Sequence, residues 1–171
     1  IAVAAFSLQI YFDFSGYTDM ARGTARLFGI RLSQNFNHPY AATSIAEFWR
    51  RWHISLSSWF KDYLYISIGG RTKRIRNSFI VFLVSGLWHG ANWPFVIWGA
   101  YHGSLMAISF KTQKIRERIR RRLPFLNLGY WQLMQTILTF NLVCIGWIFF
   151  RANSIPDAAY IASNLTHELA S

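Results

Sequence analysis

The chain has 171 residues, of which 53% are hydrophobic, 18% are aromatic and 15% are charged, and its formal net charge is +11. The aromatic content excludes a disordered basic tail, and a single cysteine, Cys144, excludes a disulfide-stabilised scaffold. Long runs without any charge argue against a soluble nucleic-acid-binding domain and favour an all-α, polytopic membrane protein. We expect one domain over residues 1–171, with no internal boundary.

The first uncharged run, Ile1 to Phe12, has neither a charged leading segment nor an initiator methionine, so it does not have the form of a signal peptide. We interpret it as the cut end of a membrane span, which makes the chain a fragment of a longer protein. Polar residues follow directly, and Asp13 to Asp19 is predicted to form a tight turn closed by local hydrogen bonds. A second turn is predicted at Asn35 to Tyr40.

The segment from Ser44 to Ile68 has the pattern of one amphipathic helix. Ser44 and Glu47 form a capping box at its start, and large apolar residues recur every three or four positions along one face. Charged side chains occupy the remaining faces. We therefore expect this helix to lie at the membrane interface, or across the bundle, instead of spanning lipid. His53 falls at the edge of the apolar face.

Two longer uncharged runs, residues 79–110 and 123–150, are candidates for membrane-spanning segments. Basic segments at residues 69–78 and 111–122 flank the first run, and the positive-inside rule predicts that both are cytoplasmic loops. The run must then enter the membrane and return, although two complete spans need about 40 residues. We predict a broken or re-entrant helix pair that turns just after His89, with a polar cavity beside that residue.

Histidines within and near the apolar runs are the strongest candidates for chemistry. An ionisable side chain inside a membrane segment is costly and by default marks function, and desolvation keeps an imidazole in the neutral form that a general base requires. For His89, a general base and a core histidine held by hydrogen bonds are equally good interpretations. His102 is better explained as a packing contact, and His38 as a structural residue of its turn.

Other kinds of site find little support in the sequence. No two histidines have the short helical spacing of metal ligands, and clusters of cysteine or carboxylate are lacking, so we expect no metal site. Gly69 to Lys73 lacks the residue order of a P-loop, and no G-x-S-x-G motif supports a serine nucleophile. The basic segment 111–122 is better explained as a juxtamembrane anchor to anionic lipid than as a nucleic-acid-binding arm.

Three motifs, found in this order, make the chain similar to a known family. They are YFDFSGYTDMARG at Tyr11–Gly23, a longer motif with EFWRRWHISLS at Asn35–Gly70, and SGLWHGANWPFVIWGAYHG at Ser85–Gly103. Together with WIFFRA, which ends at Ala152, they resemble the bacterial membrane-bound O-acyltransferase family, and most closely its alginate O-acetyltransferase branch. The resemblance implies a middle-to-C-terminal part of a multi-pass protein of the bacterial inner membrane, without the N-terminal helices and the last ones.

The resemblance also implies a fold, site residues and a reaction. The fold is a membrane helical bundle with broken and interfacial helices around a tunnel. His89 of the WHG motif is implied to be catalytic, and His53 of the RRWHISLS motif to be a second polar site residue. The reaction transfers an acyl group, typically acetyl, from acetyl-CoA or an acyl carrier to a hydroxyl of an exported polysaccharide such as alginate. No tightly bound cofactor is implied, and periplasmic acetylation partner proteins are expected.

A mechanism follows as a hypothesis. Neutral His89 takes a proton from the acceptor hydroxyl as it attacks the acyl carbonyl, while His53 positions the substrate or shares the proton. Asn92 or the indole of Trp88 is expected to donate to the developing oxyanion.

The loop Gly69 to Asn77 is short for the family, which is expected to alter how a cytoplasmic donor partner docks. D-alanyl transfer to teichoic acid, a transporter and a catalytically silent scaffold remain as alternatives.

Overall fold

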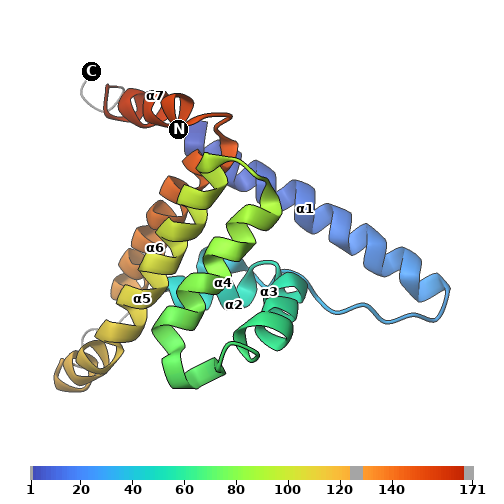
Figure 1. Ribbon diagram of the computed structural model, residues 1–171, viewed down its shortest axis with the longest axis horizontal. Coiled ribbons are helices and arrows are strands. Elements are labelled where there is room, and N and C mark those ends of the chain that lie inside the picture. The colour runs from blue at the N-terminus through green and yellow to red at the C-terminus, as the bar shows by residue number, and fades with distance from the viewer. Residues whose placement is uncertain (1, 124–128, 168–171) are drawn as a thin grey trace.

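The computed structural model describes residues 2–123 and 129–167, and within these residues every regular element is a helix, which confirms the all-α class. The α-helices are joined by one π-helical and two 3₁₀ segments (Figure 1). The bounds are α1 Ala2–Leu27, η1 Pro39–Ala41, α2 Ile45–Arg51, α3 Ile54–Phe60, the π-helical η2 Lys61–Tyr65, η3 Gly70–Lys73, α4 Arg74–His89, α5 Trp93–Arg122, α6 Gly129–Arg151 and α7 Ile155–His167.

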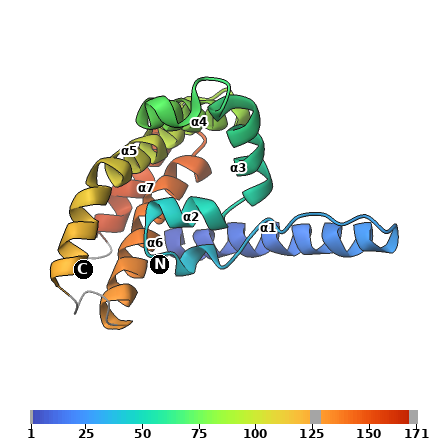
Figure 2. The same cartoon turned by 90° about the horizontal axis from the view of Figure 1, so that it is seen from below.

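Helix α1 runs without interruption through the polar stretch Asp13–Asp19, so the turn predicted there is wrong. The helix accommodates these polar side chains on its own surface. Thr18 donates to the carbonyl of Ser15, and Arg22 forms an ion pair with Asp19 one turn earlier. Local hydrogen bonds therefore form as expected, but they form within a helix. Beyond this stretch α1 extends away from the other helices, and the chain returns alongside it (Figure 2).

The first half of α1 packs on α6, and the returning loop closes over this contact. Ser7 is buried in α1, and its hydroxyl lies 3.2 Å from the thiol of Cys144 in α6. Tyr40, at the end of the predicted second turn, donates a 2.6 Å hydrogen bond from its hydroxyl to the carbonyl of Ser7. The loop thereby carries Phe36 and Ala42 into the core, where both are buried.

The amphipathic segment after Ser44 is not the single helix predicted, because it folds as α2, α3 and η2 with a break between α2 and α3. Its start agrees with the prediction in part. The backbone N–H of Glu47 donates to the Ser44 hydroxyl over 3.3 Å. The Glu47 carboxylate, however, accepts from the N–H and the hydroxyl of Thr43, each at 2.8 Å. In a capping box it would accept from the N–H of Ser44, one residue later.

Helices α4 and α5 form the predicted broken pair, an antiparallel hairpin that turns at Gly90–Asn92 (Figure 1). The two helices approach backbone to backbone. A Cβ atom on Gly86 would overlap the carbonyl of Phe95, and one on Gly99 would overlap the carbonyl of Phe82. Only glycine permits such an approach, so these two positions set how closely the hairpin closes.

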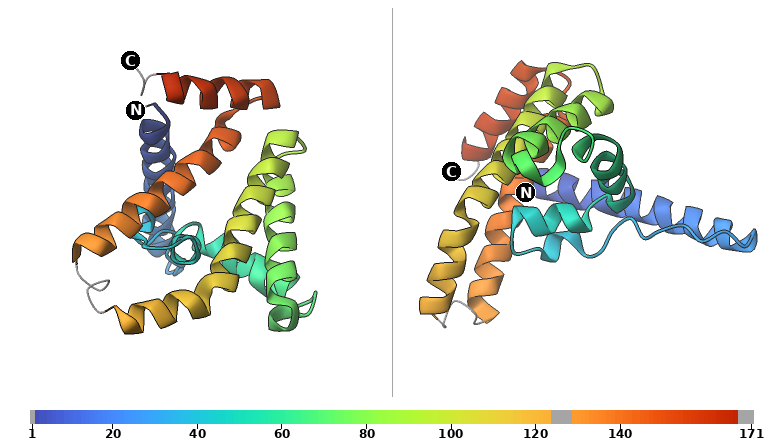
Figure 3. Two further views of the ribbon diagram at one scale, coloured as in Figure 1. Left: turned by 90° about the vertical axis from the view of Figure 1, so that its left-hand side faces the viewer. Right: turned by 60° about the horizontal axis from the view of Figure 1, so that its bottom comes forward.

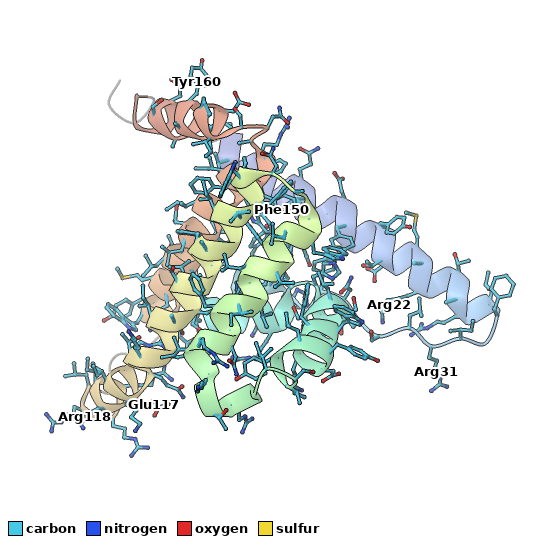
Figure 4. All side chains as sticks on the ribbon, in the orientation of Figure 1. Arg22, Arg31, Glu117, Arg118, Phe150 and Tyr160 are labelled. Atoms are coloured by element: carbon cyan, nitrogen blue, oxygen red, sulfur yellow. The ribbon has the colours of Figure 1, made fainter. Side chains whose placement is uncertain are left out.

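Residues 111–122 are helical, so the prediction of a loop there is wrong. The loop predicted at residues 69–78 is also too long, because η3 occupies Gly70–Lys73 and α4 begins at Arg74. They continue α5 as far as Arg122, and Glu117 and Arg118 lie at the far end of this extension (Figure 4). Lys and Arg are good helix formers, and Arg116 donates a 2.7 Å hydrogen bond back to the carbonyl of Ser109. Because α4 begins and α5 ends at the same end of the hairpin, the basic segments 69–78 and 111–122 lie at one end of it.

Helix α6 is the one helix of the described residues that is long and apolar enough to cross a membrane, judged by length and composition. It covers most of the predicted run 123–150, of which residues 124–128 lie outside the described part. Val143 and Trp147 of α6 are buried against Phe48 and Trp98 from α2 and α5. Helix α6 lies beside α5, and α7 crosses the end of the pair (Figure 3).

Candidate active site

A cavity of about 270 Å³ lies between the broken segment α2–α3–η2 and helices α1, α4, α5 and α6. Its wall is mostly aromatic, with polar groups at a few points. The aromatic lining residues are Phe14, Trp49, Trp52, Phe60, Tyr65, Phe82, Trp98, Trp147 and Phe150, and the polar ones are His53, Ser57, Lys61, Ser78, Ser85 and His89. A cavity is therefore present beside His89 as predicted, but its wall is mostly aromatic and not polar, and His53, the second histidine implied by the family resemblance, also lines it.

His89 is the last residue of α4, directly before the turn of the hairpin. Its half-buried imidazole packs edge to face against Trp98 and Phe150, with ring centroids 5.3 Å and 5.0 Å apart. Phe150 lies at this turn end of the bundle (Figure 4). No described residue forms a hydrogen bond with the imidazole, so the structure does not show the hydrogen-bonded core histidine. Its ring nitrogens are free to bind a molecule that enters the cavity.

His53 lies in the break between α2 and α3, where its backbone has a left-handed conformation with φ of 45°. This conformation is uncommon outside glycine, and such strained residues concentrate at functional sites. The imidazole packs edge to face on Phe14 at a centroid distance of 4.7 Å, and its buried Nδ1 has no hydrogen-bond partner among the described residues. Burial lowers the pKa of His53 below its usual value, which favours the neutral imidazole.

The break that places His53 is held by a distant part of the chain. In a continuous helix the N–H of Ser55 would bond to the carbonyl of Arg51, but here it bonds to the side chain of Asn35 at 3.2 Å. The carbonyl of Asn35 accepts from the N–H of Ile54, and the carbonyl of Arg51 accepts from Asn37, both at 2.9 Å. The returning loop thus pairs three backbone groups at the break, namely the N–H groups of Ile54 and Ser55 and the carbonyl of Arg51.

Asn92 and Trp88, the residues expected to donate to an oxyanion, lie outside the set of residues that line the cavity. The Asn92 side chain accepts from the N–H of Trp93 and donates to the carbonyl of Asn153, both at 2.8 Å. It therefore caps α5 and connects the hairpin turn to the α6–α7 connection. The Trp88 side chain is 58% exposed and packs beside the ring of His89. An oxyanion role for either residue stays a prediction.

His102 is fully buried, as a packing residue should be. Its ring contacts Trp49 and Trp98 edge to face at centroid distances of 4.9 Å and 5.1 Å. Neither ring nitrogen has a hydrogen-bond partner in the part of the chain that the structure describes. Because Trp49 and Trp98 both line the cavity, His102 supports the cavity wall from behind without reaching the cavity itself.

Three features of the site were not identified from the sequence. The turn predicted at Asn35 has no link to the segment of His53, because nothing local indicates a contact with Ser55, 20 positions away. Lys61 is expected on the charged faces of a helix, yet it lines the cavity. The sequence predicts part of the aromatic wall as the apolar face of a helix, without any sign that it lines a cavity. In residues 2–123 and 129–167 no group of three or more potential metal ligands comes together.

The arrangement is suited to proton transfer in a partly water-excluded site. A general base must lie within hydrogen-bond reach of the proton that it removes, and His89 offers an unoccupied imidazole at the cavity wall. The aromatic surroundings lower the local polarity, which strengthens each electrostatic interaction with a bound molecule. A second imidazole, that of His53, lines the same cavity, and in its neutral form it can donate or accept a hydrogen bond.

Comparison with known proteins finds a family whose sequence model covers most of the chain. The sequence model of the membrane-bound O-acyltransferase family matches residues 1–154. The chain is 47% identical over 162 residues to a probable alginate O-acetylase, AlgI, of Pseudomonas aeruginosa, which covers 92% of this chain and 29% of that protein.

Two further relatives have other acceptors in their names. The chain is 41% identical over 165 residues to a peptidoglycan O-acetyltransferase of Helicobacter pylori, covering 94% of this chain and 30% of that protein. It is 34% identical over 157 residues to a teichoic acid D-alanyltransferase of Bacillus subtilis, covering 85% of this chain and 39% of that protein. The chain thus spans about 30% of the length of the O-acetyltransferases that it matches.

Proposed function

Because this chain belongs to the membrane-bound O-acyltransferase family, we propose that it carries the active site of an enzyme that transfers acetyl groups to hydroxyls of an exported polysaccharide such as alginate. The observation that carries the proposal is the free imidazole of His89 on the wall of an aromatic cavity. The higher identity to O-acetyltransferases than to the D-alanyltransferase favours acetyl as the transferred group.

In this mechanism His89 is the general base. Its neutral imidazole takes the proton of the acceptor hydroxyl while the hydroxyl oxygen attacks the carbonyl carbon of a thioester donor. The tetrahedral intermediate collapses with loss of the thiolate, which receives the proton from the imidazolium. An ester and a free thiol are formed, and the neutral imidazole is restored. Each step needs only the acceptor, the donor and one base.

His53 acts as the second polar residue of the site. Its imidazole lines the same cavity as His89, and the backbone that carries it is fixed by the hydrogen bonds that the N–H groups of Ile54 and Ser55 donate to Asn35. A fixed donor or acceptor positions a reacting hydroxyl better than a mobile one does. We assign to His53 the orientation of the acceptor hydroxyl or of the thioester carbonyl.

The two basic segments support a topology. Residues 69–78 and 111–122 lie at the same end of the α4–α5 hairpin, so both segments can lie on the same side of the membrane. The positive-inside rule makes this the cytoplasmic side of a bacterial inner membrane. The donor, acetyl-CoA or an acyl carrier, then enters from this side. The polysaccharide and its periplasmic acetylation partner proteins meet the site from the other side.

The test uses the full-length protein in membranes, with labelled acetyl donor and purified polysaccharide. His89→Ala and His89→Gln are expected to lower acetyl transfer by about 10²–10⁴-fold while the protein remains in the membrane at normal levels. His38→Asn is the matched control, because His38 is exposed and also has a left-handed backbone, which asparagine tolerates. Transfer that persists in both His89 variants would overturn the assignment.

The same assay separates the other functions. A D-alanylated donor supplied with teichoic acid replaces acetyl and polysaccharide in a parallel reaction. If D-alanyl transfer is faster than acetyl transfer, the acceptor class is wrong although the acyltransferase mechanism is retained. A transporter or scaffold would consume no donor in either reaction.

A further inference from the structure

The cavity is elongated along one face of α4. Ser78, Phe82, Ser85 and His89 all line it, and their spacings of four, three and four residues place them on one side of the helix. At a rise of 1.5 Å per residue, the first and last of these positions are about 16 Å apart along the helix axis. The cavity therefore has two ends, one beside Ser78 and one beside His89.

The opposite wall is formed by α3 and η2, after which the chain reverses through Gly69 and η3 into α4 (Figure 1). His53, at the start of α3, interacts electrostatically with His89 and is therefore at the His89 end. Lys61 and Tyr65 follow in η2, which packs against α4 near the reversal, and lie at the Ser78 end. The cavity thus has imidazoles at one end and an ammonium group at the other.

Lys61 is the one charged residue among those that line the cavity. Within the described part of the chain, no carboxylate lies at ion-pair distance from it, since the two ion pairs found there join Asp19 with Arg22 and Glu47 with Arg51. Lys61 also begins the π-helical segment, and π-helical turns occur frequently at functional sites. An unpaired cation at the end of an aromatic cavity is available for an anionic ligand.

We propose that Lys61 binds the phosphate group of an extended thioester donor whose acyl end reaches His89. This inference rests on the proposed acetyl transfer and identifies the donor by its chemistry. The donor has a phosphate at one end, an uncharged arm that fits the aromatic middle, and a thioester at the other end. Hydroxyl groups of Tyr65 and Ser78 line the same end as Lys61 and supply further hydrogen-bond donors to the phosphate.

Two donors that differ only in the phosphate test the proposal, namely S-acetyl-4′-phosphopantetheine and S-acetylpantetheine. With the full-length protein in membranes, we expect the first donor to have a KM lower by roughly tenfold to hundredfold, the usual effect of a charge-assisted hydrogen bond. Lys61→Gln is expected to remove this difference by raising the KM for the phosphorylated donor alone. Lys61→Arg should retain most of it.

The control variant is Lys114→Gln, an exposed cation of α5 that does not line the cavity, and it should preserve the preference. Equal loss of activity with both donors in Lys61→Gln would show a structural role and overturn the proposal. A wild-type protein that uses both donors equally would overturn it as well, while leaving the role of His89 intact. Failure of the wild type to transfer acetyl from either donor would overturn the proposed function itself.

Discussion

The imidazole of His102 in α5 packs directly against the Cα atom of Gly146 in α6. A methyl group on Gly146 would overlap Nε2 of the ring and lie 2.9 Å from Cε1. The ring cannot retreat, because Trp49 and Trp98 contact it edge to face. This pair of residues therefore sets the distance between α5 and α6 at the level of the cavity wall.

The first prediction concerns this contact. Gly146→Ala should destabilise the protein by about 1–3 kcal/mol, because an added methyl group overfills a packed core. Gly16→Ala in α1 is the matched control, since nothing lies within 4 Å of a Cβ there, and it should be neutral or stabilising by about 0.5–1 kcal/mol. Thermal unfolding of the full-length protein in detergent measures both. An equal Tm for the two variants would contradict this packing.

Combining Gly146→Ala with His102→Ala extends the same prediction. Removing the imidazole makes room for the methyl group, so the double variant should lose less stability than the sum of the two single losses, by about 0.5–3 kcal/mol. Strict additivity of the two losses would show that the residues do not interact.

A second prediction concerns the closure of the α4–α5 hairpin. Gly99→Ala places a methyl group against the backbone of Phe82 and 3.2 Å from the Cα of Leu83, and backbone atoms cannot rotate away as a side chain can. The helices must separate, which moves His89 relative to Trp98. We expect a stability loss of about 1–3 kcal/mol together with a fall in kcat. Gly23→Ala, at a position of α1 with nothing within 4 Å of an added Cβ, should lower neither the stability nor kcat.

The third prediction separates two roles of Asn92. Asn92→Asp keeps the oxygen that accepts from Trp93 but loses the N–H that donates to Asn153, whereas Asn92→Ala loses both bonds. We expect losses of about 1 and about 2 kcal/mol respectively, with kcat changed only a few-fold. A fall in kcat of about 10²-fold or more at unchanged Tm would instead assign Asn92 to the oxyanion.

The fourth prediction is a pH dependence. Burial raises the pKa of Glu47, but hydrogen bonds from Thr43 and the charges of Arg51 and Arg50 lower it more, so the folded-state pKa is below the usual 4.5. A lowered pKa stabilises the fold above about pH 4.5, and this contribution is lost as the pH falls through the folded-state pKa. Glu47→Gln should therefore lose about 1 kcal/mol at neutral pH.

Below the folded-state pKa the wild-type carboxylate is also protonated, so the difference between wild type and Glu47→Gln should shrink. Thermal unfolding of both proteins at about pH 7 and about pH 3 measures this change. A stability difference that stays constant over this range would show that the ion pair with Arg51 contributes nothing.

The hairpin and the position of His89 could be predicted because their signals are local. Residues 79–110 lack charge, and Gly90 and Pro94 interrupt the helical pattern at one place, where the structure indeed turns. The continuation of α5 through residues 111–122 could not be distinguished from a loop on charge alone. Lysine and arginine suit a solvated helix as well as a loop, and only the structure decides between them.

The break at His53 could not be predicted, because its cause is a contact with a distant part of the chain. The residues around it continue the helical spacing, and neither glycine nor proline marks the position. The break is stabilised by Asn35, whose amide oxygen accepts from the N–H and the hydroxyl of Ser55. A tertiary contact thus overrides a local pattern, and the same contact decides where the second imidazole of the site lies.

The aromatic wall has a consequence for spectroscopy. The chain has eight tryptophans, and four of them, Trp49, Trp52, Trp98 and Trp147, line the cavity. Indole emission depends on the polarity of its surroundings, so a ligand that displaces water from the cavity shifts the emission of these four side chains directly. Intrinsic fluorescence can therefore report occupancy of the cavity without a label, and replacing the four residues one at a time by phenylalanine would show which part of the wall each ligand touches.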